Sequence, residues 1–327
     1  MKKSSWLFVT TLMLSTMMTI SANNWIGMWM GLELNMMSFI PLIMNKTKKS
    51  SSEAAMMYFL MQSMSSMLLM MMVLFNIYSQ SKDWIMINST ITSCLLIKMG
   101  AAPFHKWLPE ILSKMEWNKC IWLMTWQKLA PLMVMSNLNN NSMILNMSIY
   151  SSIIIGSIGG INQTSLRKMM GYSSINHMGW MLTINKSINK WLIYLIIYSL
   201  MIIMMCKMFM NYKLYFINQM GSINMTNMEK INLFCMMLSM GGLPPFIGFL
   251  PKWITIQYMI NEKEFMTIMF MIMMSLIPLM FYIRIMMNLI LSSNITIKWN
   301  KTHYNKFMTI MMIINFSLPF IMIMDII

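Results

Sequence analysis

The stretch that decides the fold runs from Cys94 to Pro131 and reads CLLIKMGAAPFHKWLPEILSKMEWNKCIWLMTWQKLAP. It is apolar enough to lie in a membrane, yet it carries Lys98 beside a Gly-Ala-Ala-Pro break and Lys128 inside the next apolar run. Charged side chains within a bilayer are costly, and they usually face a partner or a wet cavity that conducts ions or protons. The stretch therefore predicts a membrane protein with ionisable groups along a transport path.

The composition of the whole chain indicates the same class. Hydrophobic residues make up 57% of the 327 positions, only 10% are charged, and the mean hydropathy is +0.59. The net charge of +15 does not indicate a nucleic-acid partner, because the lysines lie between apolar segments and form no stripe among exposed aromatics. The 4 cysteines lack ligand spacing, which argues against a zinc site and a disulfide framework.

The residue usage indicates a mitochondrial gene. Methionine occurs 54 times, whereas arginine occurs only at Arg167 and Arg284, as in an A+T-rich genome that reads an extra codon as methionine. Only Lys2 and Lys3 precede the first apolar run, without an arginine- and serine-rich transit peptide. The alternative is a cleavable signal peptide ending near Ala22, but a second apolar span follows at once.

The fold predicted from these segments is an all-α polytopic membrane protein with a single domain over 1–327. A span needs about 20 apolar residues, and two of the predicted spans are too long for one straight crossing. Each contains a break, at Gly100–Pro103 and at Gly241–Pro245, where proline removes a donor and predicts a discontinuous helix. The eleven predicted spans are 5–22, 25–44, 54–78, 84–115, 118–137, 143–162, 166–184, 190–210, 230–260, 265–290 and 305–326.

The distribution of cations predicts the direction of each crossing. With the N-terminus in the matrix, fourteen cations fall in loops on that side and four on the other, which places the C-terminus in the intermembrane space. The four outer cations are Lys82, Lys186, Lys190 and Lys263, and the fourteen are Lys2, Lys3, Lys46, Lys48, Lys49, Lys114, Lys119, Arg167, Lys168, Lys213, Lys230, Lys298, Lys301 and Lys306.

The two broken helices are five spans apart and therefore cross in opposite directions. Spans 1–5 (about 5–137) and 6–10 (about 143–290) are predicted to be inverted repeats, followed by the last span at 305–326. Paired interrupted segments in corresponding halves are typical of a transport site. The alternative is that the breaks merely kink packed helices.

Four ionisable residues in the predicted spans form a candidate proton relay. Burial disfavours the ammonium form of a lysine and a nearby carboxylate favours it, so Glu33 is expected to tune the charge of Lys98. Lys98, Lys128 and Lys252 are expected to load and release protons, and this requires no metal or cofactor.

Weaker candidates are His105 and His177, which titrate in the useful range, and Lys207, which lies near the end of its span. A lone histidine is often only hydrogen-bonded, and a lysine near a span end commonly reaches the interface.

Six segments resemble one known family, chain 2 of mitochondrial NADH:ubiquinone oxidoreductase, respiratory complex I. The resemblance runs from about Trp25 to Lys252 and weakens after Arg284. The segments are GLELNMMSFIP, EAAMMYFLMQS, KMGAAPFHKWLPE, TWQKLAP, GGINQTSLRKMMGYSSINHMGWM and MGGLPPFIGFLPKW, the last with Met240 where the family usually has leucine.

The resemblance implies an antiporter-like fold with inverted five-helix bundles, in the inner-membrane arm of complex I. It implies neighbouring antiporter-like subunits and lipids as partners, and no redox cofactor in this chain, with NADH, FMN, iron–sulfur clusters and ubiquinone bound elsewhere. Carried over by motif, Glu33, Lys98, Lys128 and Lys252 are the proton-path residues.

Two positions depart from the family pattern. Met57 stands where relatives commonly have lysine, and Lys106 stands where an aromatic is usual, next to His105. The predicted function is proton translocation coupled to electron transfer in other subunits. The alternatives are a stand-alone cation/proton antiporter and a structural spacer whose charges only pair.

Overall fold

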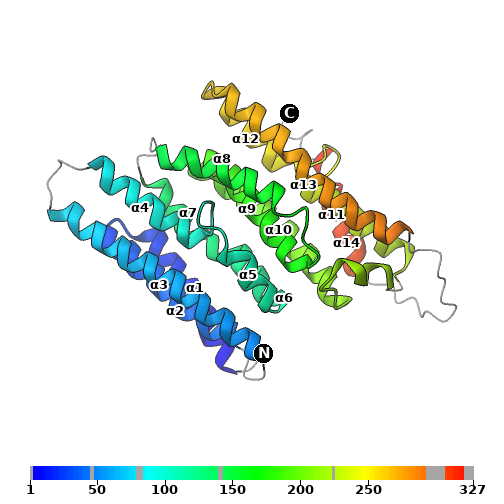
Figure 1. Ribbon diagram of the computed structural model, residues 1–327, viewed down its shortest axis with the longest axis horizontal. Coiled ribbons are helices and arrows are strands. Elements are labelled where there is room, and N and C mark those ends of the chain that lie inside the picture. The colour runs from blue at the N-terminus through cyan, green and yellow to red at the C-terminus, as the bar shows by residue number, and fades with distance from the viewer. Residues whose placement is uncertain are drawn as a thin grey trace.

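The computed structural model describes residues 3–44, 48–78, 84–138, 143–222, 225–291 and 306–319, and the regular elements in these ranges are all helical. Most of the helices lie side by side with similar tilt (Figure 1). In chain order they are α1 (Lys3–Ser21), α2 (Trp25–Ile43), α3 (Lys49–Tyr78), α4 (Trp84–Met99), α5 (Trp107–Lys114), α6 (Trp117–Met124), the 3₁₀ turn η1 (Trp126–Lys128), α7 (Leu129–Ser136), α8 (Met143–Ile158), α9 (Leu166–Thr183), α10 (Ile188–Asn211), the 3₁₀ turn η2 (Ile217–Ser222), α11 (Asn227–Gly241), α12 (Phe249–Asn261), α13 (Phe265–Leu291) and α14 (Lys306–Asn315).

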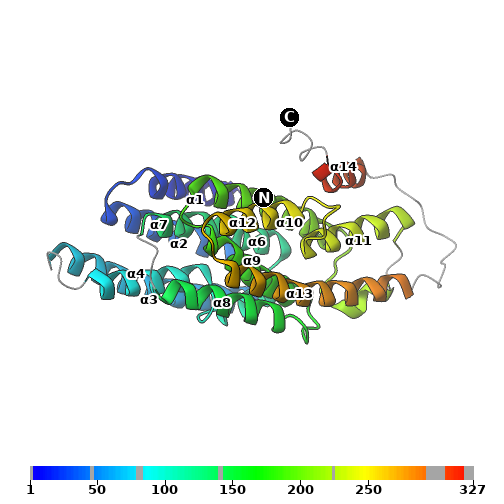
Figure 2. The same ribbon diagram turned by 90° about the horizontal axis from the view of Figure 1, so that it is seen from above.

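The chain is a multi-pass membrane protein. Four described helices, α2, α3, α10 and α13, are long and apolar enough to cross a bilayer, and the described part also contains shorter apolar helices. Figure 2 shows α3, α4, α8 and α13 along one face of the bundle. Large apolar side chains remain exposed on α3 and α13, among them Met67 and Met266, as expected of surfaces that face acyl chains.

The two predicted breaks are confirmed, and both are built in the same way. Gly100 and Gly242 have left-handed φ angles of +69° and +77°, which glycine adopts without steric cost. Each glycine N–H donates to the carbonyl three residues earlier, and the next N–H donates to the carbonyl five residues before it, at 2.9–3.3 Å. This is the Schellman motif, which satisfies the last carbonyls of α4 and α11.

A third interruption lies in the predicted span 118–137, which the sequence analysis treated as one helix. The structure divides it into α6, η1 and α7. Pro131 has no N–H to donate to the Gln127 carbonyl and its ring crowds that carbonyl. The helix therefore tightens into a 3₁₀ turn at Trp126–Lys128, and the number of discontinuous segments exceeds the predicted two.

The contacts between helices follow one pattern in both halves. In the first half α1 packs on α2 and on α7, and α3 packs on both α4 and α5. In the second half α8 packs on α9 and on α13, and α10 packs on both α11 and α12. The third helix of each half thus holds both segments of its broken helix. Of the last predicted span, 305–326, the structure describes residues 306–319, which include α14, and the other residues of the span lie outside the described ranges.

Candidate functional site

Lys98 lies in the last turn of α4, where the partial negative charge of the helix end favours a cation. The residue is buried, and Gln62 from α3 donates to its backbone carbonyl at 3.1 Å. Glu33 on α2 is half-buried and acts electrostatically on the Lys98 ammonium. Within the described ranges this pair is not among the ion pairs shorter than 4.0 Å. The Glu33 carboxylate and the Lys98 ammonium are therefore not in direct contact.

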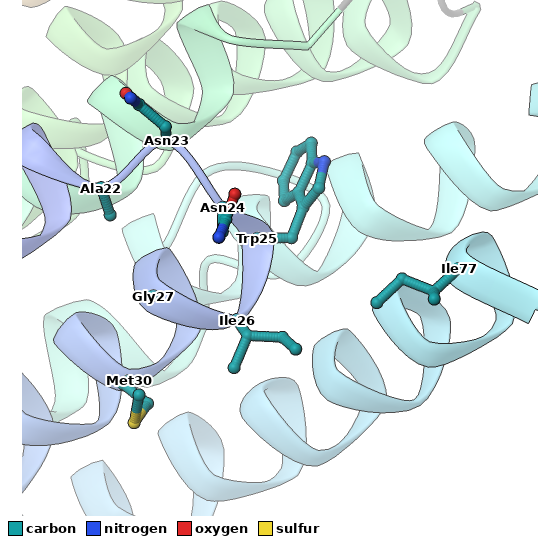
Figure 3. A pocket seen from close by; sticks show the side chains of 8 residues that line it. All are labelled: Ala22, Asn23, Asn24, Trp25, Ile26, Gly27, Met30 and Ile77. Carbon is teal, nitrogen blue, oxygen red and sulfur yellow. The ribbon is translucent and has the colours of Figure 1, made fainter.

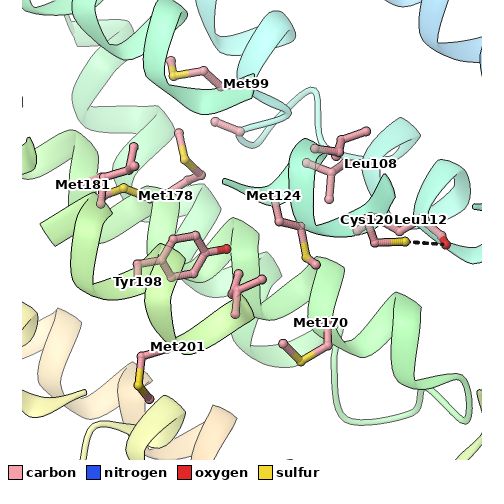
Figure 4. Close-up of a cluster of buried hydrophobic side chains, with 14 of the residues drawn as sticks. Met99, Leu108, Leu112, Cys120, Met124, Met170, Met178, Met181, Tyr198 and Met201 are labelled. Carbon is pink, nitrogen blue, oxygen red and sulfur yellow. Dashed lines mark hydrogen bonds between the residues drawn. The ribbon is translucent and has the colours of Figure 1, made fainter. Parts of the chain in front are cut away.

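Lys98 and Lys128 line the same small internal cavity of about 10 Å³. That volume admits about one water molecule. Met99 and Leu108, which also line the cavity, are among the buried side chains in Figure 4. The two lysines, 30 positions apart in sequence, are thus brought to one place by α4 and η1.

Lys128 joins the two halves of the bundle. Its Nζ donates to the Ser174 carbonyl of α9 at 3.1 Å and to the Tyr198 hydroxyl of α10 at 3.3 Å, and it lies 4.7 Å from the centre of the Tyr198 ring. Only 2% of the residue is exposed. Figure 4 shows Tyr198 among buried methionines, including Met178 and Met201. A buried ammonium is stabilised here by two acceptors and an aromatic face.

The ammonium groups of Lys128 and Lys252 both act electrostatically on the His177 ring. The ring is buried, its Nδ1 lies 2.8 Å from the Tyr194 hydroxyl oxygen, and its centre lies 4.9 Å from that of Tyr198. Among the predicted relay residues, this histidine is therefore associated with Lys128 and Lys252.

Lys252 reaches back from α12 across the break to α11. Its Nζ donates to the Gly241 carbonyl at 2.6 Å and lies 5.7 Å from the centre of a Trp180 ring. The residue is buried. Lys98 and Lys252 come from opposite sides of their breaks, but both place an ammonium at the C-terminal end of the first helical segment.

Other predicted residues lie apart from this row. His105 is half-buried in the break between α4 and α5, with its Nδ1 3.2 Å from the Pro103 carbonyl oxygen. Lys106 and Lys207 are exposed. Met57, which stands where relatives commonly have a lysine, is half-buried and packs against the core. The roles of His105 and Lys207 stay predictions.

Polar residues that the sequence analysis did not single out complete the site. Tyr194 and Tyr198 contact His177 and Lys128, and α10 presents both on its buried face because they are four positions apart. Tyr58 and Gln127 line the cavity between the two first-half lysines. The sequence signal that could have identified Tyr194 and Tyr198 is their spacing of four positions within an apolar span, which places two polar groups on one helix face.

A separate pocket of about 700 Å³ opens where α1 meets α2, beside the end of α3 (Figure 3). Its lining has no ionisable side chain and so includes none of the predicted relay residues. The described residues also contain no group of three or more His, Cys, Asp or Glu side chains that could hold a metal ion. The pocket is lined by Ala22, Asn23, Asn24, Trp25, Ile26, Gly27, Met30 and Ile77.

Discontinuous helices around a buried row of lysines define an antiporter-like membrane protein. A family model described as NADH:quinone oxidoreductase/Mrp antiporter matches residues 22–278. NADH-ubiquinone oxidoreductase chain 2 of Anopheles gambiae is 41% identical and covers 97% of this chain and 95% of its own, and that of Locusta migratoria is 40% identical over 85% and 83%. The chain belongs to the NADH-ubiquinone oxidoreductase chain 2 family, the antiporter-like membrane subunit of respiratory complex I.

Solved structures share the fold. A chain of respiratory complex I from Thermus thermophilus superposes with a TM-score of 0.79 at 18% identity, covering 87% of this chain and 70% of that one. A chain of the Mrp complex from Dietzia sp. gives 0.75 at 14% identity, covering 85% and 59%. The antiporter-like fold and the family predicted from the six segments are confirmed.

Proposed function

We propose that this chain translocates protons across the mitochondrial inner membrane, driven by electron transfer from NADH to ubiquinone in other subunits of complex I. Protons move along a relay in which Glu33 tunes Lys98, and Lys98, Lys128 and Lys252 load and release in turn. His177 carries the proton between Lys128 and Lys252. FMN, the iron–sulfur clusters and ubiquinone belong to other subunits, and this chain needs no cofactor of its own.

The observation that carries the proposal is the position of Lys128. Its ammonium is buried, yet it comes from the first half and binds acceptors on α9 and α10 of the second half. A structural ion pair does not account for it, because the ammonium donates its hydrogen bonds to a carbonyl and a hydroxyl. An unneutralised ammonium in a buried site is costly, and a residue that gives up its proton avoids this cost for part of each cycle.

The proposal includes a single membrane domain of eleven spans, with spans 1–5 and 6–10 as inverted repeats. The matching Schellman motifs and the repeated helix contacts support it. The N-terminus then faces the matrix and the C-terminus the intermembrane space, and the exposed apolar flanks face lipids and neighbouring antiporter-like subunits.

The relay is tested by proton yield per electron in membranes that contain the assembled complex. Lys98→Met removes the charge and keeps the length, so the complex should assemble, oxidise NADH in uncoupled membranes and pump fewer protons. Lys106→Met is the matched control, because that side chain is exposed. A structural spacer predicts an unchanged proton yield in both variants.

A stand-alone cation/proton antiporter is the second candidate, since the Mrp complex shares the fold. It predicts sodium-dependent proton exchange by the isolated chain in liposomes. The relay within complex I predicts no such exchange without the other subunits.

A further inference from the structure

A chain of hydrogen bonds joins three helical elements beside the first two relay lysines. The Tyr58 hydroxyl of α3 donates to Gln127 Oε1 at 3.2 Å, and Gln127 Nε2 donates to Asn35 Oδ1 of α2 at 3.1 Å. Tyr58 and Asn35 are each only 3% exposed. We call Tyr58, Gln127 and Asn35 the amide chain.

Two of the three residues of the amide chain face the cavity that Lys98 and Lys128 share. Tyr58 and Gln127 both line this cavity. The Trp107 indole also lines it, but its N–H already donates to the Ile97 carbonyl at 3.2 Å. The other lining side chains, Met99, Leu108 and Leu123, are apolar. Apart from the two lysines, the polar side chains free to orient a water there are therefore those of Tyr58 and Gln127.

The direction of each hydrogen bond determines which donors and acceptors the cavity wall presents to a water molecule. Because the Tyr58 hydroxyl donates its hydrogen to Gln127 Oε1, the lone pairs of the Tyr58 oxygen are available to accept from a water or an ammonium. Gln127 uses one amide hydrogen on Asn35 and keeps the other. A water in the cavity can then receive a proton from Lys98 while its own hydrogens are held toward acceptors.

We propose that the amide chain is a positioning device for proton transfer from Lys98 to Lys128 through one water in their shared cavity. In this step the Lys98 ammonium gives one proton to the water and becomes an amine. The water gives one proton to the Lys128 amine, which becomes an ammonium, and the water itself is unchanged. Tyr58 and Gln127 do not change protonation. The inference rests on the proposed relay and assigns the residues that make one of its steps efficient.

Tyr58→Phe removes only one oxygen atom and so tests the inference with little risk to folding. In the assembled complex, loss of this hydrogen bond should slow proton translocation about three- to tenfold, and the solvent deuterium isotope effect should rise as the step becomes limiting. Gln127→Leu should do the same, and the double variant should be no slower than either single one. Tyr150→Phe is the matched control, because Tyr150 lies on α8 against Phe270, outside the site.

The outcomes separate this inference from the relay itself. If Lys98→Met lowers the proton yield while Tyr58→Phe and Gln127→Leu match the parent in rate and isotope effect, the positioning role is overturned and the relay stands. If Lys98→Met leaves the proton yield unchanged, the relay fails and the inference fails with it. Equal slowing by Tyr150→Phe would also overturn the inference, because the effect would not be specific to the cavity.

Discussion

The Lys252 ammonium lies 2.6 Å from the Gly241 carbonyl oxygen, so a lysine of α12 closes the C-terminal end of α11 across the break. Gly242 makes this approach possible. A Cβ atom added there would lie 2.6 Å from Lys252 Nζ, and its φ of +77° is unfavourable for other residues.

Gly242→Ala should therefore displace Lys252 and impair proton pumping. Backbone strain should cost about 1 kcal/mol of stability, and the proton yield per electron should fall toward that of Lys252→Met. Gly241→Ala is the matched control, because its Cβ would meet Leu279 at an ordinary 3.5 Å. Equal proton yields for the two alanine variants would contradict this account of the break.

The His177–Tyr194 contact predicts energetic coupling between the two residues. Tyr194→Phe frees the imidazole from its partner at 2.8 Å, so transfer between Lys128 and Lys252 should slow. A double-mutant cycle with His177→Gln should give a coupling of about 1 kcal/mol in the activation free energy of proton translocation. Strictly additive effects would show that this hydrogen bond does not serve the relay.

Arg284 is expected to act on stability alone. From α13 its Nη2 donates to the Gln163 carbonyl at 2.9 Å and its Nη1 donates to the Ile161 carbonyl, both in the turn after α8. Arg284→Lys keeps the charge but cannot reproduce this fork, so thermal unfolding of the complex should show a loss of about 1–3 kcal/mol. The proton yield per electron of the surviving complex should equal that of the parent, and a reduced yield would mean that Arg284 belongs to the relay.

Much of the framework follows from local sequence signals. Glycine and proline clusters located both broken helices, because their backbone consequences do not depend on tertiary context. Lys98, Lys128 and Lys252 stood out because an ammonium within an apolar run is rare. The interruption at Trp126–Lys128 was missed although Pro131 signals it, because its effect falls on residues before the proline.

The links between these residues could not be predicted from the sequence. The approach of Lys128 to Ser174 and Tyr198 depends on how α9 and α10 pack on η1, and it joins residues 46 and 70 positions apart. The cavity shared by Lys98 and Lys128 likewise exists only once α3, α4, α5, α6 and η1 are assembled. Local patterns carry no information on such separations.

The most direct test of the central claim is the proton yield per electron of complex I that carries Lys128→Met. From its place in the first half, this lysine donates to acceptors on α9 and α10 of the second half, and methionine fills its space without a charge. The relay predicts an assembled complex that oxidises NADH in uncoupled membranes but translocates fewer protons per electron than the parent. An assembled Lys128→Met complex with the parent's proton yield would contradict the account.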